Sequence, residues 1–246
     1  MNLFKEVGKY VLFLKEIFQK TERRSVYYDL TIKEIYNLGL QSLPFVAFVS
    51  IFVGAVVTLQ TEANTGNSWT PRYIIGFATR DSIVLEFSPT IISLLLAGKV
   101  GSYIASGIGT MRVTEQIDAL EIMGVNSAGY LTLPKIIALI FFNPVLIMVS
   151  IVIGVYGGYL AGTLTGACTS EEFIMGLQVE FPIIKIIYSL SKTIVFAFFI
   201  ATVPAYYGYY TTGGALGIGK ASTKAVVYTS VIIIILNLIL TDILLS

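Results

Sequence analysis

The chain has 246 residues, of which 55% are hydrophobic and 13% are charged, and its mean hydropathy is +0.81. A soluble domain carries roughly a quarter charged residues, so this composition indicates a membrane protein. Sixteen basic residues against 15 acidic ones leave no basic excess, and no nucleic-acid partner is expected. The single Cys168 excludes an internal disulfide, and the absence of histidine removes the commonest metal ligand and catalytic base.

Near the N-terminus, apolar residues recur every three or four positions and charged residues fall on the opposite face. The apolar set is Phe4, Val7, Val11, Leu14 and Phe18, and the charged set is Lys5, Lys9, Glu16 and Lys20. This pattern predicts an amphipathic helix at the membrane surface, with packing on another protein as the alternative. A second short helix is expected around Tyr27 to Leu40, and together these helices form an interfacial region over residues 1–42. Charges interrupt this region, so we expect it to remain in the mature protein.

Long uncharged stretches predict about five transmembrane helices and an all-α polytopic fold, with residues 1–246 as a single domain and residues 43–246 as its bundle. The first stretch, Ile35 to Thr61, has about 27 residues, which exceeds the ~20 that cross the hydrocarbon core. The spans are expected at Pro44–Gln60, at Ile83–Ile104, within Ile136–Ser170, within Thr193–Gly219 and at Ala225–Thr241. The fourth span is expected to end near Pro204 and a tyrosine cluster, whose rings suit a membrane interface: Tyr206, Tyr207, Tyr209 and Tyr210.

The distribution of basic residues predicts the orientation of the chain. Seven lysines and arginines precede the first span, whereas the first loop has Arg72 and Arg80 together with acids. Basic segments stay in the cytoplasm, so the N-terminus is expected inside. Five spans then place residues 99–135 and 206–224 in the cytoplasm and the acidic residues 168–180 outside.

A charged segment, Arg112 to Glu121, interrupts the hydrophobic chain between the second and third spans. Val113, Ile117 and Leu120 share one helical face, and Glu115, Asp118 and Glu121 share another. Gly124 can end such a helix in the left-handed conformation. The pattern predicts a short amphipathic helix over residues 113–123 outside the membrane. A solvated connector is the alternative, but the acidic and apolar stripes favour docking of a partner.

Two glycine patterns differ in what they indicate. Gly154, Gly158, Gly162 and Gly166 recur every four residues, which predicts a face for close helix packing, either within the subunit or across a dimer. Gly214, Gly219 and Lys220 match the spacing of a phosphate loop, but Ala221 follows where a hydroxyl should hold magnesium. We therefore interpret residues 214–220 as a flexible inner loop.

Two polar residues of the spans are candidates for lining a substrate path. Glu86 lies early in the second span, where a carboxylate facing lipid would be costly, and Gln60 lies at the outer end of the first. For both residues, a hydrogen bond that only fixes helix packing is the alternative. No catalytic or metal site is expected.

Two sequence motifs carry a resemblance to a known family. AGKVGSYIASGIGTMRVTEQIDALEIMGV, from Ala97 to Val125, and FVGAVVTLQ, from Phe52 to Gln60, resemble motifs of the MlaE-type permeases. These are membrane subunits of ABC transporters that act on lipids together with MCE proteins. The chain departs from the family at Leu85 and Lys99, where arginine is frequent, and at Gly107, where glutamate is common.

The resemblance implies a homodimeric, multi-pass permease of the bacterial inner membrane that moves phospholipid or another hydrophobic lipid. Each subunit would dock a cytoplasmic ABC ATPase, which holds ATP and magnesium, while an MCE protein sits on the periplasmic side; the chain itself would bind no cofactor. The coupling residues implied are Arg112, Glu115, Gln116, Ile117, Asp118, Leu120, Glu121 and Met123. The alternatives are a secondary transporter or channel that uses Glu86 and Lys99 without an ATPase, and an intramembrane lipid enzyme.

Overall fold

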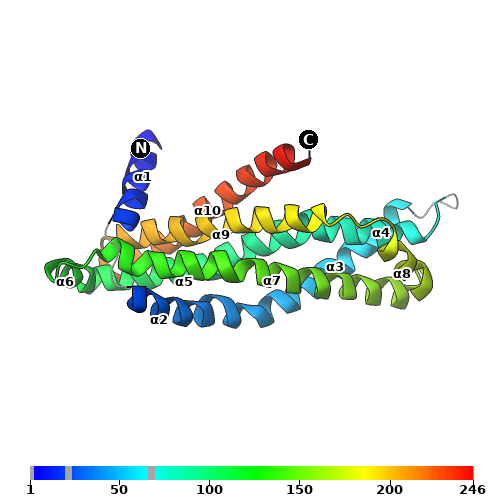
Figure 1. Cartoon of the computed structure of the whole chain (residues 1–246), viewed down its shortest axis with the longest axis horizontal. Coiled ribbons are helices and arrows are strands. Elements are labelled where there is room, and N and C mark those ends of the chain that lie inside the picture. Colours follow the sequence, from blue (N-terminus) through cyan, green and yellow to red (C-terminus); the bar gives the residue numbers. More distant parts are fainter. Residues whose placement is uncertain (1–2, 20–23, 66–69, 246) are drawn as a thin grey trace. The chain divides into compact units, whose positions relative to one another are not determined.

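The computed structural model describes residues 3–19, 24–65 and 70–245 of the chain. These residues form helices and turns and contain no β-strand, which confirms the predicted all-α fold (Figure 1). The α-helices are α1 (Leu3–Gln19), α2 (Arg24–Glu34), α3 (Leu43–Thr65), α4 (Tyr73–Ser82), α5 (Ile92–Val113), α6 (Gln116–Ile122), α7 (Ser127–Thr165), α8 (Ser170–Gln178), α9 (Ile184–Tyr209) and α10 (Gly214–Leu245). Lys20 and the side chain of Phe4 lie outside the described residues.

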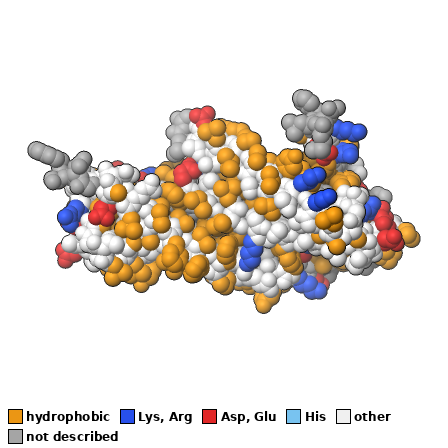
Figure 2. All heavy atoms as spheres, turned by 180° about the vertical axis from the view of Figure 1, so that it is seen from behind, with side chains coloured by type: hydrophobic (Ala, Val, Ile, Leu, Met, Phe, Trp, Pro, Cys, Tyr) orange, Lys and Arg blue, Asp and Glu red, His pale blue; other side chains and the backbone are white. Residues whose placement is uncertain are grey.

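Within the described residues, five helical segments are long and apolar enough to cross a membrane, as predicted. They are Val26–Thr65, Tyr73–Val113, Ser127–Thr165, Ile184–Tyr209 and Gly214–Ile243. Hydrophobic side chains cover much of the molecular face in Figure 2, as expected of helices surrounded by lipid. The chain is therefore a multi-pass membrane protein.

The last two spans begin earlier than the sequence predicted. α9 starts at Ile184 instead of Thr193, and it ends at Tyr209, within the tyrosine cluster where its end was predicted. α10 starts at Gly214 instead of Ala225, so the prediction of a flexible loop at Gly219 and Lys220 was wrong. The turn between α9 and α10 is shorter than predicted, because Gly213 and Gly214 have φ angles of 92° and 67°. Glycine adopts this left-handed conformation without steric cost.

The second span is one helical run with an irregular centre. α4 continues through a π-helical segment, Ile83–Ile91, into α5. Pro89 lies inside this segment and has no N–H to donate, which accounts for the wider turn. The irregular segment contains Glu86, and π-helical turns often occur at functional sites.

Residue contacts divide the chain into two compact units, each assembled from segments that are distant in sequence. Unit 1 comprises Met1–Leu40, Ser93–Asn143 and Ile194–Leu245, and unit 2 comprises Gln41–Ile92 and Pro144–Thr193. Both α7 and α9 contribute residues to each unit. The single domain over residues 1–246 stays a prediction.

In unit 2, glycines bring the backbones of α3 and α7 into contact. A Cβ atom at Gly54 would lie 1.8 Å from the carbonyl oxygen of Gly154, and one at Gly158 would lie 2.5 Å from Oγ1 of Thr58. Gly162 also faces Thr58, so three of the four glycines predicted to pack do so within one chain. Gly166 was wrongly included, because it lies beyond α7 at a φ of 77° with open space around it.

The same unit contains a second close packing, which the sequence did not indicate. α4 and α8 lie side by side (Figure 1), and a Cβ atom at Gly176 would lie 2.1 Å from the carbonyl oxygen of Tyr73. Thr169 and Glu172 form a capping box at the start of α8. This cap fixes the point at which the chain turns back after α7.

In unit 1, α1 is attached to the protein by a face that differs from its predicted membrane face. Phe13 and Ile17 are fully buried, and the ring centre of Phe13 lies 5.2 Å from that of Tyr209. Val7, Val11 and Phe18 are exposed. The helix therefore has two apolar faces, one that packs against the aromatic end of α9 and one that remains available to the membrane surface.

Candidate functional site

The charged segment of unit 1 forms a shorter helix than predicted. α6 runs from Gln116 to Ile122, whereas Val113 belongs to the end of α5. The predicted helix over residues 113–123 was too long, because Glu115 adopts a φ of 59° and interrupts the helical path. A left-handed glutamate is costly in energy, so surrounding contacts must hold this corner.

Gly124 ends α6 as predicted, with a φ of 78°. The N–H of Val125 donates to the carbonyl of Leu120 at 3.1 Å, and the N–H of Gly124 donates to that of Glu121 at 2.9 Å. These two bonds form a Schellman motif. Both ends of α6 are thus set by left-handed residues, which make it a short rod between two sharp corners.

Three side chains attach α6 to the rest of unit 1. Ile117 is fully buried, and Asp118 forms an ion pair of 2.7 Å with Arg112. Oε1 of Glu121 accepts hydrogen bonds from Oη of Tyr209 at 2.9 Å and from Oγ of Ser127 at 3.1 Å. Two residues of the acidic stripe that was predicted to dock a partner therefore also hold the helix in place.

The last side chain of α6 and the side chain of its C-terminal cap are exposed. Ile122 is 88% exposed and Met123 is 68% exposed. Hydrophobic side chains with this exposure, next to acidic residues and outside the membrane-spanning segments, are typical of a docking surface. Met123 was among the predicted coupling residues and Ile122 was missed, although both follow the acidic stripe directly.

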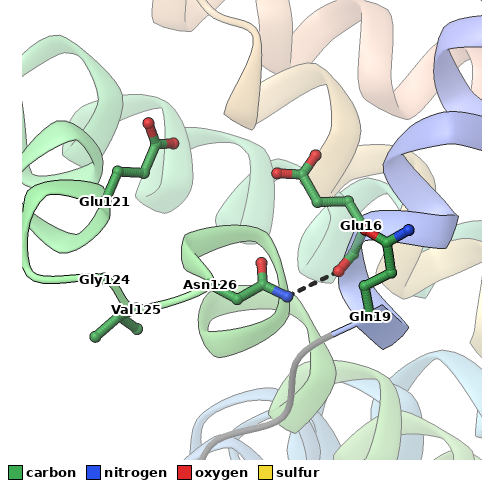
Figure 3. Close-up of a pocket in the computed structure, with 6 residues that line it drawn as sticks. All are labelled: Glu16, Gln19, Glu121, Gly124, Val125 and Asn126. Carbon is green, nitrogen blue, oxygen red and sulfur yellow. Dashed lines mark hydrogen bonds between the residues drawn. The ribbon is translucent and has the colours of Figure 1, made fainter.

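A pocket of about 480 Å³ lies between the end of α1 and the turn from α6 to α7 (Figure 3). Glu16 and Glu121 both line it, and Nδ2 of Asn126 donates to the backbone carbonyl of Glu16 at 2.8 Å. Burial raises the pKa of Glu16, and the negative charge of Glu121 raises it further. We therefore expect the attachment of α1 to depend on pH.

We expect Glu16→Gln to strengthen the attachment of α1 at neutral pH. An acid whose pKa is raised in the folded state does not destabilise the protein at a pH below its ordinary pKa. The folded state loses stability as the pH rises through the pKa of the folded state. The glutamine variant should show slower hydrogen exchange in α1, by at most about fivefold because partly exposed charges are screened. Comparison of both proteins at each pH cancels the intrinsic exchange rate, and the difference should vanish at low pH.

Glu6→Gln provides the opposite control for this experiment. Glu6 is also on α1, but its carboxylate accepts a hydrogen bond of 3.1 Å from Tyr206. Its substitution weakens that bond and should speed exchange in α1. Equal exchange in the Glu16→Gln and wild-type proteins at neutral pH would contradict the repulsion between Glu16 and Glu121.

In unit 2, Glu86 is the centre of a polar cluster within the second span. Nζ of Lys192 lies 2.7 Å from its Oε1 atom, and the hydroxyls of Tyr188 and Thr90 donate to the carboxylate at 3.2 and 3.3 Å. The side chain of Lys192 is fully buried, whereas that of Glu86 is 39% exposed. Lys192 was missed because it was placed outside the fourth span. Gln60 lies exposed on α3, and the described contacts do not join it to this cluster.

A second cationic centre of unit 2 connects α4 to the segment between α8 and α9. The Arg80 guanidinium donates to the carbonyls of Leu177 and Val179, both at 2.6 Å, and pairs with Asp81. Lys185 also pairs with Asp81 at 2.5 Å. Arg80 is 5% exposed, so it stabilises the contact between these segments. In the sequence it was considered only as one of the basic residues of the first loop.

Comparison with known proteins places these features in a family. The family model described as Permease MlaE matches residues 31–243. The chain belongs to the MlaE permease family. This confirms the resemblance carried by the two motifs, one of which contains α6.

Curated MlaE relatives match over nearly the whole chain. A probable ABC transporter permease protein of Rickettsia bellii is 38% identical over 98% of this chain and 93% of its own length. One of Synechocystis is 33% identical over 85% of this chain and 80% of its length. The Haemophilus influenzae protein named intermembrane phospholipid transport system permease protein MlaE is 29% identical over 99% of this chain and 93% of its length. As an ABC transporter permease, this chain belongs to a class of component that is not itself the ATPase.

Proposed function

We propose that this MlaE-family permease moves phospholipid, or another hydrophobic lipid, between the bacterial inner membrane and a periplasmic MCE partner. Two copies form the membrane domain, and each docks a separate cytoplasmic ATPase that holds ATP and magnesium. The permease itself binds no cofactor. The family match supports the transport class, and the H. influenzae relative supports phospholipid as the substrate class.

The observation that carries this proposal is α6, a short helix with both ends fixed and with Ile122 and Met123 exposed. In our proposal α6 is the coupling helix, and closure of the ATPase pair pushes on it. A rigid, well-attached rod transmits such a push, whereas a flexible connector would absorb it. The cytoplasmic side follows from the seven basic residues that precede the first span.

The grouping of loops within each unit supports the alternation of five spans. The corner after α5 and the end of α9 meet in unit 1, where the Arg112 guanidinium lies 5.9 Å from the ring centre of Tyr209. In unit 2, the start of the second span and the segment after the third span meet, since Ile75, Cys168 and Phe173 form a buried cluster. A chain with five alternating spans requires both pairings, whichever side its N-terminus lies on.

In the proposed lipid path, Glu86 is the group that a headgroup reaches first, because it is the exposed member of its ion pair. Lys192 balances its charge from a fully buried position. Gln60 is a second polar candidate along α3. The exposed apolar side chains of α8, Ile174 and Met175, form a docking surface for the periplasmic partner.

Charge reversal on α6 tests this function. We expect the triple variant Glu115→Lys, Asp118→Lys, Glu121→Lys to lose at least about 90% of the ATPase that copurifies with the wild-type permease, since like charges across a docked surface cost several kcal/mol. Because Glu121 also holds α6, Ile122→Asp provides a second variant that changes only an exposed side chain. Glu171→Lys on α8 is the control and should retain the ATPase fully. Undiminished ATPase in both α6 variants would refute the docking assignment.

A further inference from the structure

Tyr209, the last residue of α9, contacts four other helices or their ends within unit 1. Its hydroxyl lies 2.9 Å from Oε1 of Glu121 and 2.8 Å from Oγ of Ser127, at the start of α7. Its ring centre lies 5.2 Å from that of Phe13 on α1 and 5.9 Å from the Arg112 guanidinium at the end of α5. The residue is only 6% exposed, so these contacts are sheltered from water.

α6 needs contacts of this kind because it cannot hold its own conformation. It has seven residues, far fewer than the ~12–15 that an isolated helix needs. The ion pair from Arg112 to Asp118 is partly exposed, with side chains that are 35% and 48% accessible, and such pairs hold weakly. The hydrogen bonds to the Glu121 carboxylate are charge-assisted, and Tyr209 donates one of them from a buried position.

We propose that Tyr209 is a positioning residue for coupling. Its hydroxyl sets the orientation of α6 through Glu121, while its ring ties this hydrogen bond to Phe13 of α1. A push on α6 by the ATPase is then passed to α9 and to the membrane-surface helix α1 together. This inference rests on the proposed role of α6 and extends it to residues outside the coupling motif.

Packing alone is the competing explanation, and the chain offers a matched pair of variants that separates it from the hydroxyl's role. Tyr209→Phe keeps the ring and removes only the hydroxyl, with its hydrogen bond to Glu121 and its contact with Ser127. Tyr210→Phe changes the next residue, whose ring also contacts Phe13, at 6.0 Å. Within the described part of the chain, no side chain forms a hydrogen bond with the Tyr210 hydroxyl.

The first measurement follows the permease without its partner. A spin label is placed at Met123→Cys in a Cys168→Ser background, which leaves one cysteine in the chain. We expect Tyr209→Phe to increase the mobility of the label clearly, whereas Tyr210→Phe leaves the spectrum unchanged. Identical spectra for the two variants would overturn the proposal.

The second measurement follows coupling in the reconstituted complex with the ATPase. Loss of a hydrogen bond to a charged group should weaken ATPase binding, or its stimulation by the permease, by about 5- to 20-fold in Tyr209→Phe. Tyr210→Phe should stay within about twofold. Because Tyr209 acts through Glu121, the double variant Tyr209→Phe, Glu121→Ala should be no worse than Glu121→Ala alone. Additive losses would overturn the proposal.

These outcomes are distinct from failure of the proposed function. If Ile122→Asp and the triple charge reversal both leave ATPase binding intact, α6 is not the docking helix, whatever the spin label reports. If those variants release the ATPase while Tyr209→Phe behaves like Tyr210→Phe, only the positioning role of Tyr209 is wrong.

Discussion

Gly54→Ala is expected to destabilise the permease by about 3 kcal/mol or more, although it adds a single methyl group. The added Cβ atom would lie 1.8 Å from the carbonyl oxygen of Gly154 and 2.6 Å from its carbonyl carbon. Both are backbone atoms, so no side-chain rotation relieves the clash and α3 must move away from α7. That movement also separates Ser50 and Ser150, whose hydroxyls lie 2.9 Å apart.

Gly98→Ala is the matched control for Gly54→Ala. Gly98 is a helical glycine of α5, and a Cβ atom there would meet no atom within 4 Å. The same substitution should stabilise this position by up to about 1 kcal/mol, because alanine favours the helix. Thermal unfolding in detergent compares the two variants, and equal melting temperatures would show that α3 and α7 are not in backbone contact.

Features that depend on local sequence could be predicted from the chain, and long-range partners could not. The five spans follow from uncharged stretches, and the end of α6 follows from Gly124, whose conformation depends on its own backbone. The left-handed conformation of Glu115 carries no such signal, since glutamate rarely adopts it. The predicted length of α6 was wrong for this reason.

The second apolar face of α1 also could not be assigned from the sequence, because its partners are distant in the chain. Periodicity identified one apolar stripe. In the stripe beside it, Phe13 and Ile17 are buried in the protein and Tyr10 is partly buried. Tyr10 and Phe13 pack against tyrosines nearly two hundred residues away, and the ring centres of Tyr10 and Tyr206 are 5.7 Å apart. The Tyr10 hydroxyl also forms a hydrogen bond of 2.6 Å with that of Thr202. A period of 3.6 residues identifies which positions share a face, but it does not identify the surface that the face meets.

Charged residues within spans were the hardest to interpret, because a charge can indicate either the end of a span or a polar site inside it. The fourth span was predicted to begin at Thr193, which placed Lys192 outside it, although this lysine lies within α9. The same reasoning left Glu86 without a partner in the sequence, and Lys99 was the only intramembrane cation considered. A pattern of opposite charges in two different spans would have suggested the pair of Glu86 and Lys192, since an intramembrane charge needs a counter-charge.

Glu86→Gln is expected to be more damaging than Lys192→Met, and the double variant is expected to recover much of the loss. Removing the carboxylate leaves the Lys192 ammonium fully buried without its 2.7 Å partner, which costs about 3–5 kcal/mol. Removing the lysine instead leaves a carboxylate that is 39% exposed and that keeps the hydroxyls of Tyr188 and Thr90 as donors. The yield and melting temperature of the solubilised permease measure this order.

Lipid transport by the double variant Glu86→Gln, Lys192→Met then separates stability from function. If the pair only stabilises the bundle, a folded double variant should transport lipid at the wild-type rate. If Glu86 contacts the headgroup, we expect transport to fall at least about tenfold in a protein that melts normally, because the exposed polar group of the path is lost. Glu171→Gln, an exposed acid of α8, should change neither property. A reversed order of the two single variants would show that Lys192, and not Glu86, is the member of the pair that reaches water or substrate.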